Sequence, residues 1–392
     1  MGKNGMKKKK TPIRGTVITV LIYLGLGIAM GLIFAPYLNG REGETLTRSQ
    51  ELLRFAVIIA VFYAATVIQT GIHEAGHLVF GLLSGYRFTS YRVFNLMWIR
   101  VDGQIRFRRT SIAGTGGQCL MEPPELKDGK IPVLLYNYGG AIMNLISAAV
   151  FAGLALLCRG ESVPRGILLS LAVCGAAYAL LNALPLSIGG VNNDGLNALD
   201  MVFEPKAVRA FWIQMKANAL SARGMRLREM PEEWFAVPDE ESMKNAITAG
   251  IGALAASRLM DELKFDEAES LMKELLAQDN ALVGLYRNLM TCDRMYIELI
   301  GENRPEVLES LRTKEQLKFM KAMKNYPSVL RTEYTRALLG EKDRKKAKKI
   351  RGDFEKISGS FPYPRELEAE GELMEIAEKK EAEISASGKD HE

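Results

Sequence analysis

Four uncharged stretches constrain the fold of this 392-residue chain more than any other feature. No Asp, Glu, Lys or Arg occurs in residues 15–40, 55–72, 131–158 or 166–193. A helix needs about 20 apolar residues to cross a bilayer, and the second stretch reaches that length by continuing to about residue 83. We therefore predict a mainly α-helical, polytopic membrane protein with spans at about 15–39, 55–84, 131–157 and 166–187.

The basic residues predict the orientation of these spans. The first span follows the basic segment 1–14, and we expect it to be an uncleaved anchor because 26 uncharged residues exceed the apolar core of a signal peptide. Segments 1–14 and 86–130 hold fourteen Lys and Arg residues, whereas segments 41–54 and 159–165 hold five. Basic loops stay in the cytoplasm, so we expect an integral membrane protein with both termini there.

The loop between the second and third spans, residues 86–130, reads as a membrane-associated cytoplasmic β-hairpin region. Asp102-Gly103 is a strong two-residue turn signal, and "QIRFRR" alternates after it. We expect one set of side chains to point inward: Phe94, Trp98, Ile105 and Phe107. We expect a second set to face lipid phosphates: Arg87, Arg92, Arg100, Arg106, Arg108 and Arg109. A sheet edge here can either rest on the membrane without a further role or hold an extended substrate.

The second half of the chain is charged and predicts a soluble α-helical domain over residues 204–373. The segment "LMDELKFDEAESLMKELLAQD" resembles the turn of a tetratricopeptide hairpin, and "LLGEKDRKKAKKIRGDFEKI" repeats it, with Ala268 matching Ala347. A similar segment near Val307 lies between them, giving a period near 40 rather than the usual 34. The alternative is a plain helical bundle. Residues 374–392 read as a charged, disordered tail.

The motif "HEAGH" at residues 73–77 interrupts the second apolar stretch near its cytoplasmic end. On a helix, His73 and His77 share one face and can both bind a zinc ion, while Glu74 can lie beside the metal and take a proton from water. Ionisable groups at membrane depth are costly, which makes them functional candidates. The alternative is a polar contact between two spans.

A catalytic zinc ion needs a third protein ligand, and the only other histidine, His391, lies in the tail. Asp194, after the fourth span, is the main candidate. Glycines 189, 190 and 195 around it allow sharp bends. Asp200, Glu122 and Asp102 are alternatives, and Asp194 can also belong to a simple Asp-Gly turn.

These residues resemble the site-2 protease family of intramembrane zinc metalloproteases. The resemblance covers about residues 55–200 and rests on HEAGH in a span, the later Asp-Gly at 194–195, and "GGAIMN" at 139–144. It implies that one Zn²⁺ is bound by His73, His77 and Asp194, with Glu74 as the catalytic base. It places Asn144 near the active site, and Asn182 is a further candidate for support there. Ala141 and Asn193 stand where the family often has proline.

The resemblance implies a zinc endopeptidase of a bacterial plasma membrane that cleaves transmembrane or membrane-proximal segments of membrane proteins, in regulated intramembrane proteolysis. The C-terminal helical domain is expected to bind a protein partner. The alternative function is a catalytically inactive membrane scaffold that presents this domain.

Other functions are disfavoured by composition. The mild net charge of +5 argues against a dedicated nucleic-acid-binding protein. The ATP-dependent membrane zinc proteases also carry HEAGH, but the lack of a G-x-x-x-x-G-K-[ST] loop argues against that class. The four scattered cysteines read as reduced thiols. Cys119 is a poor candidate for a nucleophile, because both histidines that could activate it belong to the motif.

Overall fold

The computed structural model describes residues 13–38, 46–101, 103–110, 115–160, 162–188 and 191–387. The chain divides into two compact units. The four-helix unit comprises Met1–Val93 and Gly116–Val208, and the C-terminal unit comprises Phe94–Thr115 and Arg209–Glu392.

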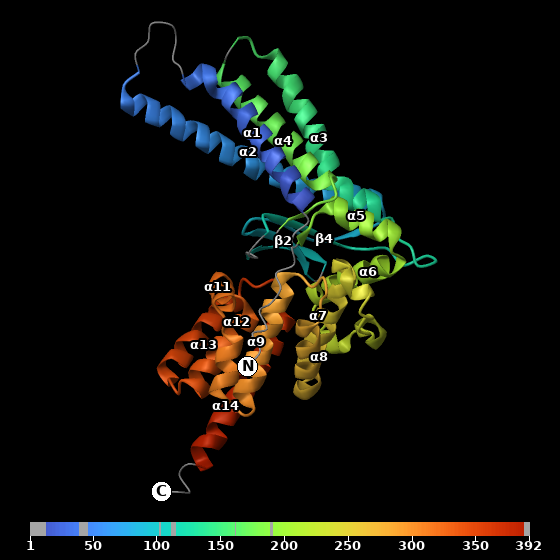
Figure 1. The fold of residues 1–392 in the computed structure, drawn as a ribbon, viewed down its shortest axis with the longest axis vertical. Coiled ribbons are helices and arrows are strands. Elements are labelled where there is room, and N and C mark those ends of the chain that lie inside the picture. The colour runs from blue at the N-terminus through green and yellow to red at the C-terminus, as the bar shows by residue number, and fades with distance from the viewer. Residues whose placement is uncertain are drawn as a thin grey trace. The chain divides into compact units, whose positions relative to one another are not determined.

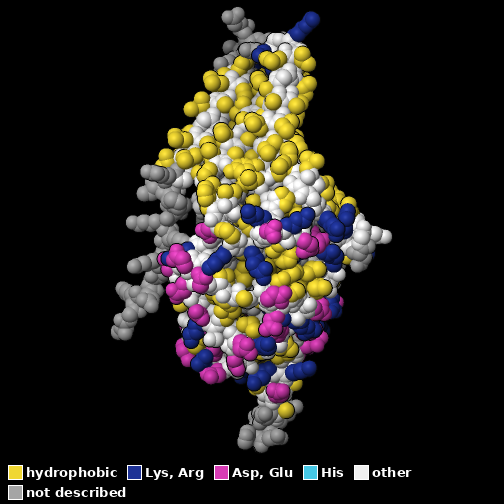
Figure 2. All heavy atoms as spheres, turned by 90° about the vertical axis from the view of Figure 1, so that its right-hand side faces the viewer, with side chains coloured by type: hydrophobic (Ala, Val, Ile, Leu, Met, Phe, Trp, Pro, Cys, Tyr) yellow, Lys and Arg dark blue, Asp and Glu magenta, His cyan; other side chains and the backbone are white. Residues whose placement is uncertain are grey.

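The four-helix unit contains four helices that are long and apolar enough to cross a membrane. They are α1 (Ile13–Leu38), α2 (Arg48–Leu83), α3 (Val133–Leu157) and α4 (Val163–Ala183). Helices α1 and α3 both pack on α4, and α2 packs mainly on α3 and α4 (Figure 1). On the face shown in Figure 2, apolar side chains cover these helices, whereas charged side chains gather on the C-terminal unit. The four predicted spans are confirmed as apolar helices.

Helix α2 is longer than the predicted span because its start is well capped. Thr47 and Gln50 form a reciprocal capping box, which satisfies backbone donors at the first turn. The helix therefore begins seven residues before the predicted start, and its 36 residues extend about 54 Å at 1.5 Å per residue.

Short strands and one helix complete the four-helix unit. Strand β1 (Arg87–Val93) pairs antiparallel with β4 (Gly117–Glu122), with a register shift between Phe88 and Ser90. Strands β5 (Ser187–Ile188) and β6 (Val191–Asn192) form a small antiparallel pair after α4. Helix α5 (Asp194–Phe203) follows and packs on α3 and α4.

The predicted hairpin is present as β2 (Leu96–Val101) and β3 (Gln104–Arg109), joined at Gly103 and Asp102, the latter outside the described residues. The side chains that this hairpin buries and exposes differ from those predicted. Met97 and Ile99 are buried against Ala222 of the C-terminal unit. The four side chains expected to point inward are instead 38–60% exposed, namely Phe94, Trp98, Ile105 and Phe107.

Two residues show where the loop departs from the prediction. Phe94 has a φ of 53° and forms part of a turn that splits residues 87–101 into two strands, which reverses the direction of the chain. Arg92, expected to face lipid phosphates, lies in β1 and is only 1% exposed.

The C-terminal unit is helical apart from the β2–β3 hairpin, as predicted. Its elements are α6 (Pro205–Ala222, which begins in the four-helix unit), η1 (Leu227–Glu229), η2 (Glu232–Phe235), η3 (Ser242–Lys244), α7 (Ala246–Asp261), α8 (Phe265–Ala277), α9 (Gly284–Ile300), α10 (Pro305–Leu311), α11 (Lys314–Ala322), α12 (Pro327–Thr335), the π-helical η4 (Arg336–Gly340), α13 (Arg344–Ser358) and α14 (Pro364–Ser387).

One turn recurs along this unit. Leu263, Asn303 and Lys342 all have φ between 54° and 60°, although none is glycine. They are spaced 40 and 39 residues apart, and each precedes a new helix. Ala268 and Ala347, the alanines matched in the sequence, lie five residues after the first and third of these turns and are buried.

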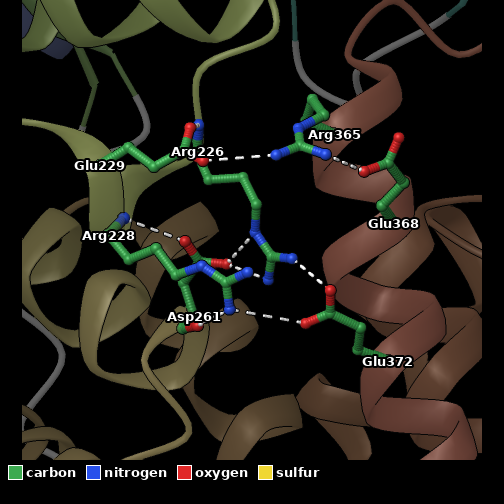
Figure 3. A network of polar contacts seen from close by, with 7 residues as sticks. All are labelled: Arg226, Arg228, Glu229, Asp261, Arg365, Glu368 and Glu372. Carbon is green, nitrogen blue, oxygen red and sulfur yellow. Dashed lines mark hydrogen bonds and ion pairs between the residues drawn. The ribbon is translucent and has the colours of Figure 1, made fainter.

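The last helix differs from the predicted tail. Helix α14 continues to Ser387, and its Met374 and Ala377 are fully buried in a core with α12 and α13. Ion pairs also hold it: Arg226 bridges Asp261 of α7 and Glu372 of α14 (Figure 3). Residues 388–392, with His391, lie outside the described residues.

Candidate metal centre

The two histidines of the HEAGH motif lie one turn apart on α2, and both are buried. Their Nε2 atoms are 3.1 Å apart, and their rings meet edge to face. The predicted sharing of one helix face is therefore confirmed.

The other ring nitrogen of each histidine meets an oxygen. His77 Nδ1 lies 2.7 Å from the carbonyl oxygen of Tyr136, and His73 Nδ1 lies 2.8 Å from Oδ1 of Asn144. Such oxygens can only accept a hydrogen bond, so each Nδ1 carries the hydrogen. Each Nε2 is then left with a lone pair, and the two lone pairs converge.

Asp194 supplies a third acceptor to the same point. Its Oδ2 lies 3.0 Å from Nε2 of His73 and 3.4 Å from Nε2 of His77. Asp194 can therefore offer a carboxylate oxygen at the point where the two ring nitrogens converge.

Asn193 holds Asp194 in place at the junction of α4 and α5. Its Oδ1 caps α5 by accepting from the backbone N–H of Leu196, and it also accepts from the N–H of Leu186. Its Nδ2 donates to the carbonyl oxygens of Leu181 and Leu184 at the end of α4. Asn193 thus ties the end of α4 to the start of α5.

The three acceptors fit a divalent metal ion. Zinc–nitrogen distances of 2.0–2.1 Å and tetrahedral geometry give about 3.3 Å between ligand atoms, close to the observed 3.0–3.4 Å. Two lone pairs and a carboxylate facing one point repel one another unless a cation lies between them. Within the described ranges, this is the one group of three such residues that could hold a metal ion.

Glu74 lies beside this group but is not tied to it. Its side chain is buried, and no described residue hydrogen-bonds its carboxylate. Gly117, the first residue of β4, packs directly on it: a Cβ at Gly117 would lie 2.4 Å from Oε1 of Glu74. The carboxylate is therefore placed by contact with β4 and stays available to accept a proton.

The ring of His73 fits only because α3 has glycine opposite it. A Cβ at Gly140 would lie 2.4 Å from Cε1 and 2.6 Å from Nδ1 of that ring. Gly140 belongs to the "GGAIMN" segment, so this part of the sequence lies at the site, as does Asn144.

The remaining candidates lie elsewhere. Asn182 donates to the carbonyl oxygen of Tyr178 in its own helix and not to the His–His–Asp group. The alternative ligands Asp200 and Glu122 are outside that group, since Asp200 accepts from Asn192 and Glu122 lies in β4. Asp102 lies outside the described residues, as do glycines 189 and 190.

Cys119 is buried in β4, and burial raises the pKa of its thiol well above the ordinary value. A thiol that stays protonated is a poor nucleophile, so the structure gives Cys119 no catalytic role.

Sequence reasoning missed two residues of the site. Tyr136 orients His77 through its backbone carbonyl, which no side-chain pattern can reveal. Asn193 precedes Asp194 directly, and an N-cap residue before the helical segment "DGLNALDMVF" was a signal that could have identified it.

Comparison of this chain with protein-family models, with curated proteins and with solved structures finds no match.

Proposed function

We propose that this protein is an intramembrane zinc endopeptidase of the site-2 protease kind. The observation that carries the proposal is the convergence of three acceptors, from His73, His77 and Asp194, beside an untied glutamate in an apolar helix. A structural polar contact between spans would pair donors with acceptors, whereas here the acceptors face one another.

The proposed reaction is hydrolysis of a peptide bond. Zinc bound by the three ligands would polarise the peptide carbonyl and activate a water molecule. Glu74 would accept the proton of that water and pass it to the leaving nitrogen, which needs a carboxylate free of other partners. The glutamate described above meets this requirement.

Strand β4 is suited to hold the substrate. A helical peptide bond is shielded by its own turns, so the substrate must be extended before cleavage. Strand β4 is the last strand of the sheet order β3-β2-β1-β4, and its Gly117 packs on Glu74. An extended segment could add to this edge by main-chain hydrogen bonds.

The cellular setting follows from the same proposal. We expect an integral protein of a bacterial plasma membrane, with both termini in the cytoplasm, because the basic loops would lie inside. The C-terminal unit would be a tetratricopeptide-like repeat, as the recurring turns favour, and would bind a protein partner. The substrates would be membrane-tethered proteins.

The test compares the wild type with Glu74→Gln. Purified wild-type protein should contain one zinc ion per chain, and the variant should retain it. In membranes, quantitative proteomics should show an uncut precursor that accumulates only in the variant, because proton transfer contributes about 10²–10⁴-fold to the rate. A wild type without stoichiometric zinc, or identical membrane proteomes, would favour the inactive scaffold.

A further inference from the structure

A chain of buried side-chain amides connects His73 to two other helices. Asn144 of α3, whose Oδ1 meets His73, donates from Nδ2 to the side-chain Oε1 of Gln69 at 2.8 Å and to the main-chain oxygen of Gln69 at 3.0 Å. Gln69 lies on α2, one turn before His73, and both amides are 0% exposed. Gln69 contacts neither Asp194 nor His77 through a hydrogen bond, so its place needs another explanation.

Two backbone carbonyls fix the direction of every bond in this chain. Gln69 Nε2 donates to the carbonyl oxygen of Leu171 on α4 at 2.9 Å, and a carbonyl can only accept. The amide oxygen of Gln69 must therefore point the other way, where it accepts from Asn144 and from the hydroxyl of Ser147 at 3.1 Å.

The main-chain oxygen of Gln69 constrains Asn144 in the same sense. It can accept only from Nδ2 of Asn144, so the opposite end of that amide, Oδ1, faces His73. A flipped Asn144 would set its Oδ1 against two oxygens of Gln69. His73 is thus obliged to carry its hydrogen on Nδ1 and to present the Nε2 lone pair to Asp194 and His77.

We propose that Gln69 is a positioning residue that sets the tautomer and ring orientation of His73 through Asn144. The inference rests on the proposed function, because the tautomer matters only if Nε2 binds a metal. The two histidines then differ: His77 is oriented directly by a backbone carbonyl, whereas His73 depends on two side chains. Outer groups that orient a metal-bound histidine change metal affinity by about 10–100-fold.

The experiment uses the full-length protein in detergent, with zinc affinity measured by chelator competition and the visible spectrum recorded after Co²⁺ substitution. Gln69→Leu keeps the approximate volume and removes both polar ends. We expect zinc affinity to fall by about 10–100-fold and the Co²⁺ spectrum to change, because His73 can then adopt the other tautomer. The unbranched Gln69→Met is a second variant that tests the same loss if leucine disturbs packing.

Two control variants are measured for zinc affinity and the Co²⁺ spectrum in the same way. Asn182→Leu makes the same chemical change on α4, where the amide bonds only its own helix, and should leave affinity and spectrum as in the wild type. Ser147→Ala removes one donor to Gln69 but keeps the Asn144 bond, so its effect should be small.

A double-mutant cycle separates positioning from a general packing role. If Gln69 acts through Asn144, then adding Gln69→Leu to Asn144→Leu should lower zinc affinity no further. Additive losses, or wild-type affinity and spectrum in both Gln69 variants, would overturn the inference. A wild type that binds no zinc would instead overturn the proposed function itself.

Discussion

Charged side chains meet their partners in opposite ways in the two units. In the C-terminal unit, Arg331 is fully buried, pairs with Asp293 and Glu370, and lies over the ring of Tyr296. Arg226 likewise lies between Asp261 and Glu372 (Figure 3). In the four-helix unit, Asp194 faces the Nε2 atoms of His73 and His77. The ring hydrogens of both histidines lie on Nδ1, on the side away from Asp194.

This difference separates structural polar groups from a site. A buried ion pair that is complete within the chain ties elements together and needs nothing else. A group of acceptors without a donor or cation at its centre is incomplete within the chain. The first kind of cluster should therefore govern the stability of the fold, and the second kind should govern ligand binding.

The largest expected effect comes from Asp194→Asn, which removes the one carboxylate among the three proposed ligands. Zinc affinity should fall by more than about 100-fold and cleavage should cease, since a neutral amide is a poor zinc ligand. The melting temperature of the metal-free protein should not fall, because no buried cation loses its partner. Metal analysis and thermal unfolding test both statements.

Asp200→Asn is the matched control in the same helix, and it should keep its zinc. Retention of zinc by Asp194→Asn, or its loss in both variants, would contradict the assignment of this ligand.

Arg331→Met should have the opposite result: it should lower the stability of the fold and leave zinc binding unchanged. It leaves Asp293 and Glu370 buried without a cation, and loss of one partner of a buried pair costs about 3–5 kcal/mol. Denaturant unfolding should show this loss, while zinc binding by the folded protein should be unchanged. Arg344→Met removes an exposed pair with Glu381 and should cost less than about 1 kcal/mol. Equal losses in the two variants would contradict the comparison.

Gly140→Ala should affect the centre by crowding alone. The added methyl group would overlap the His73 ring, and overpacking costs about 1–3 kcal/mol in addition to a loss of zinc affinity. Gly153→Ala on the same helix meets nothing within 4 Å and should be neutral. Chelator competition on both variants gives the comparison, and equal affinity in the two would argue against close contact.

A further expected effect concerns pH and lies in the C-terminal unit. Burial, with the neighbouring Glu370, raises the pKa of Glu366 to about 8. The folded state then holds a proton that the unfolded chain releases near pH 4.5, so stability should fall as pH rises from about 4.5 to 8. Glu366→Gln should remove this dependence and raise the melting temperature at pH 8 by several degrees.

Glu375→Gln, at an exposed position of the same helix, is the control for that measurement. If it flattened the pH profile as much as Glu366→Gln, the effect would not come from the buried carboxyl.

The sequence predicted the parts of this molecule that depend on local patterns. Uncharged runs revealed the four long helices, and the fixed spacing of HEAGH placed His73 and His77 on one face. The Asp-Gly turn located the β2–β3 hairpin. Ala268 and Ala347 marked helical hairpins, because a small residue is needed where two helices cross closely.

The remainder depends on contacts between distant residues. Alternation in residues 87–101 could not reveal the turn at Phe94, so the exposed face of the hairpin was assigned wrongly. The charged composition of residues 374–387 hid the apolar pair Met374 and Ala377, which makes α14 continue. Gln69 had no recognisable signal, because its role arises from Asn144 and Leu171, 75 and 102 residues away.

The length of α2 bears on how water would reach the proposed reaction. At about 54 Å the helix exceeds the roughly 30 Å hydrocarbon layer, so it must lean or protrude from it. His77 is six residues from the last residue of the helix, which is about 9 Å along its axis. The proposed hydrolysis would consume one water molecule per bond cut, and a site so close to the end of the helix would need only a short water-filled passage rather than a pore through the whole bilayer.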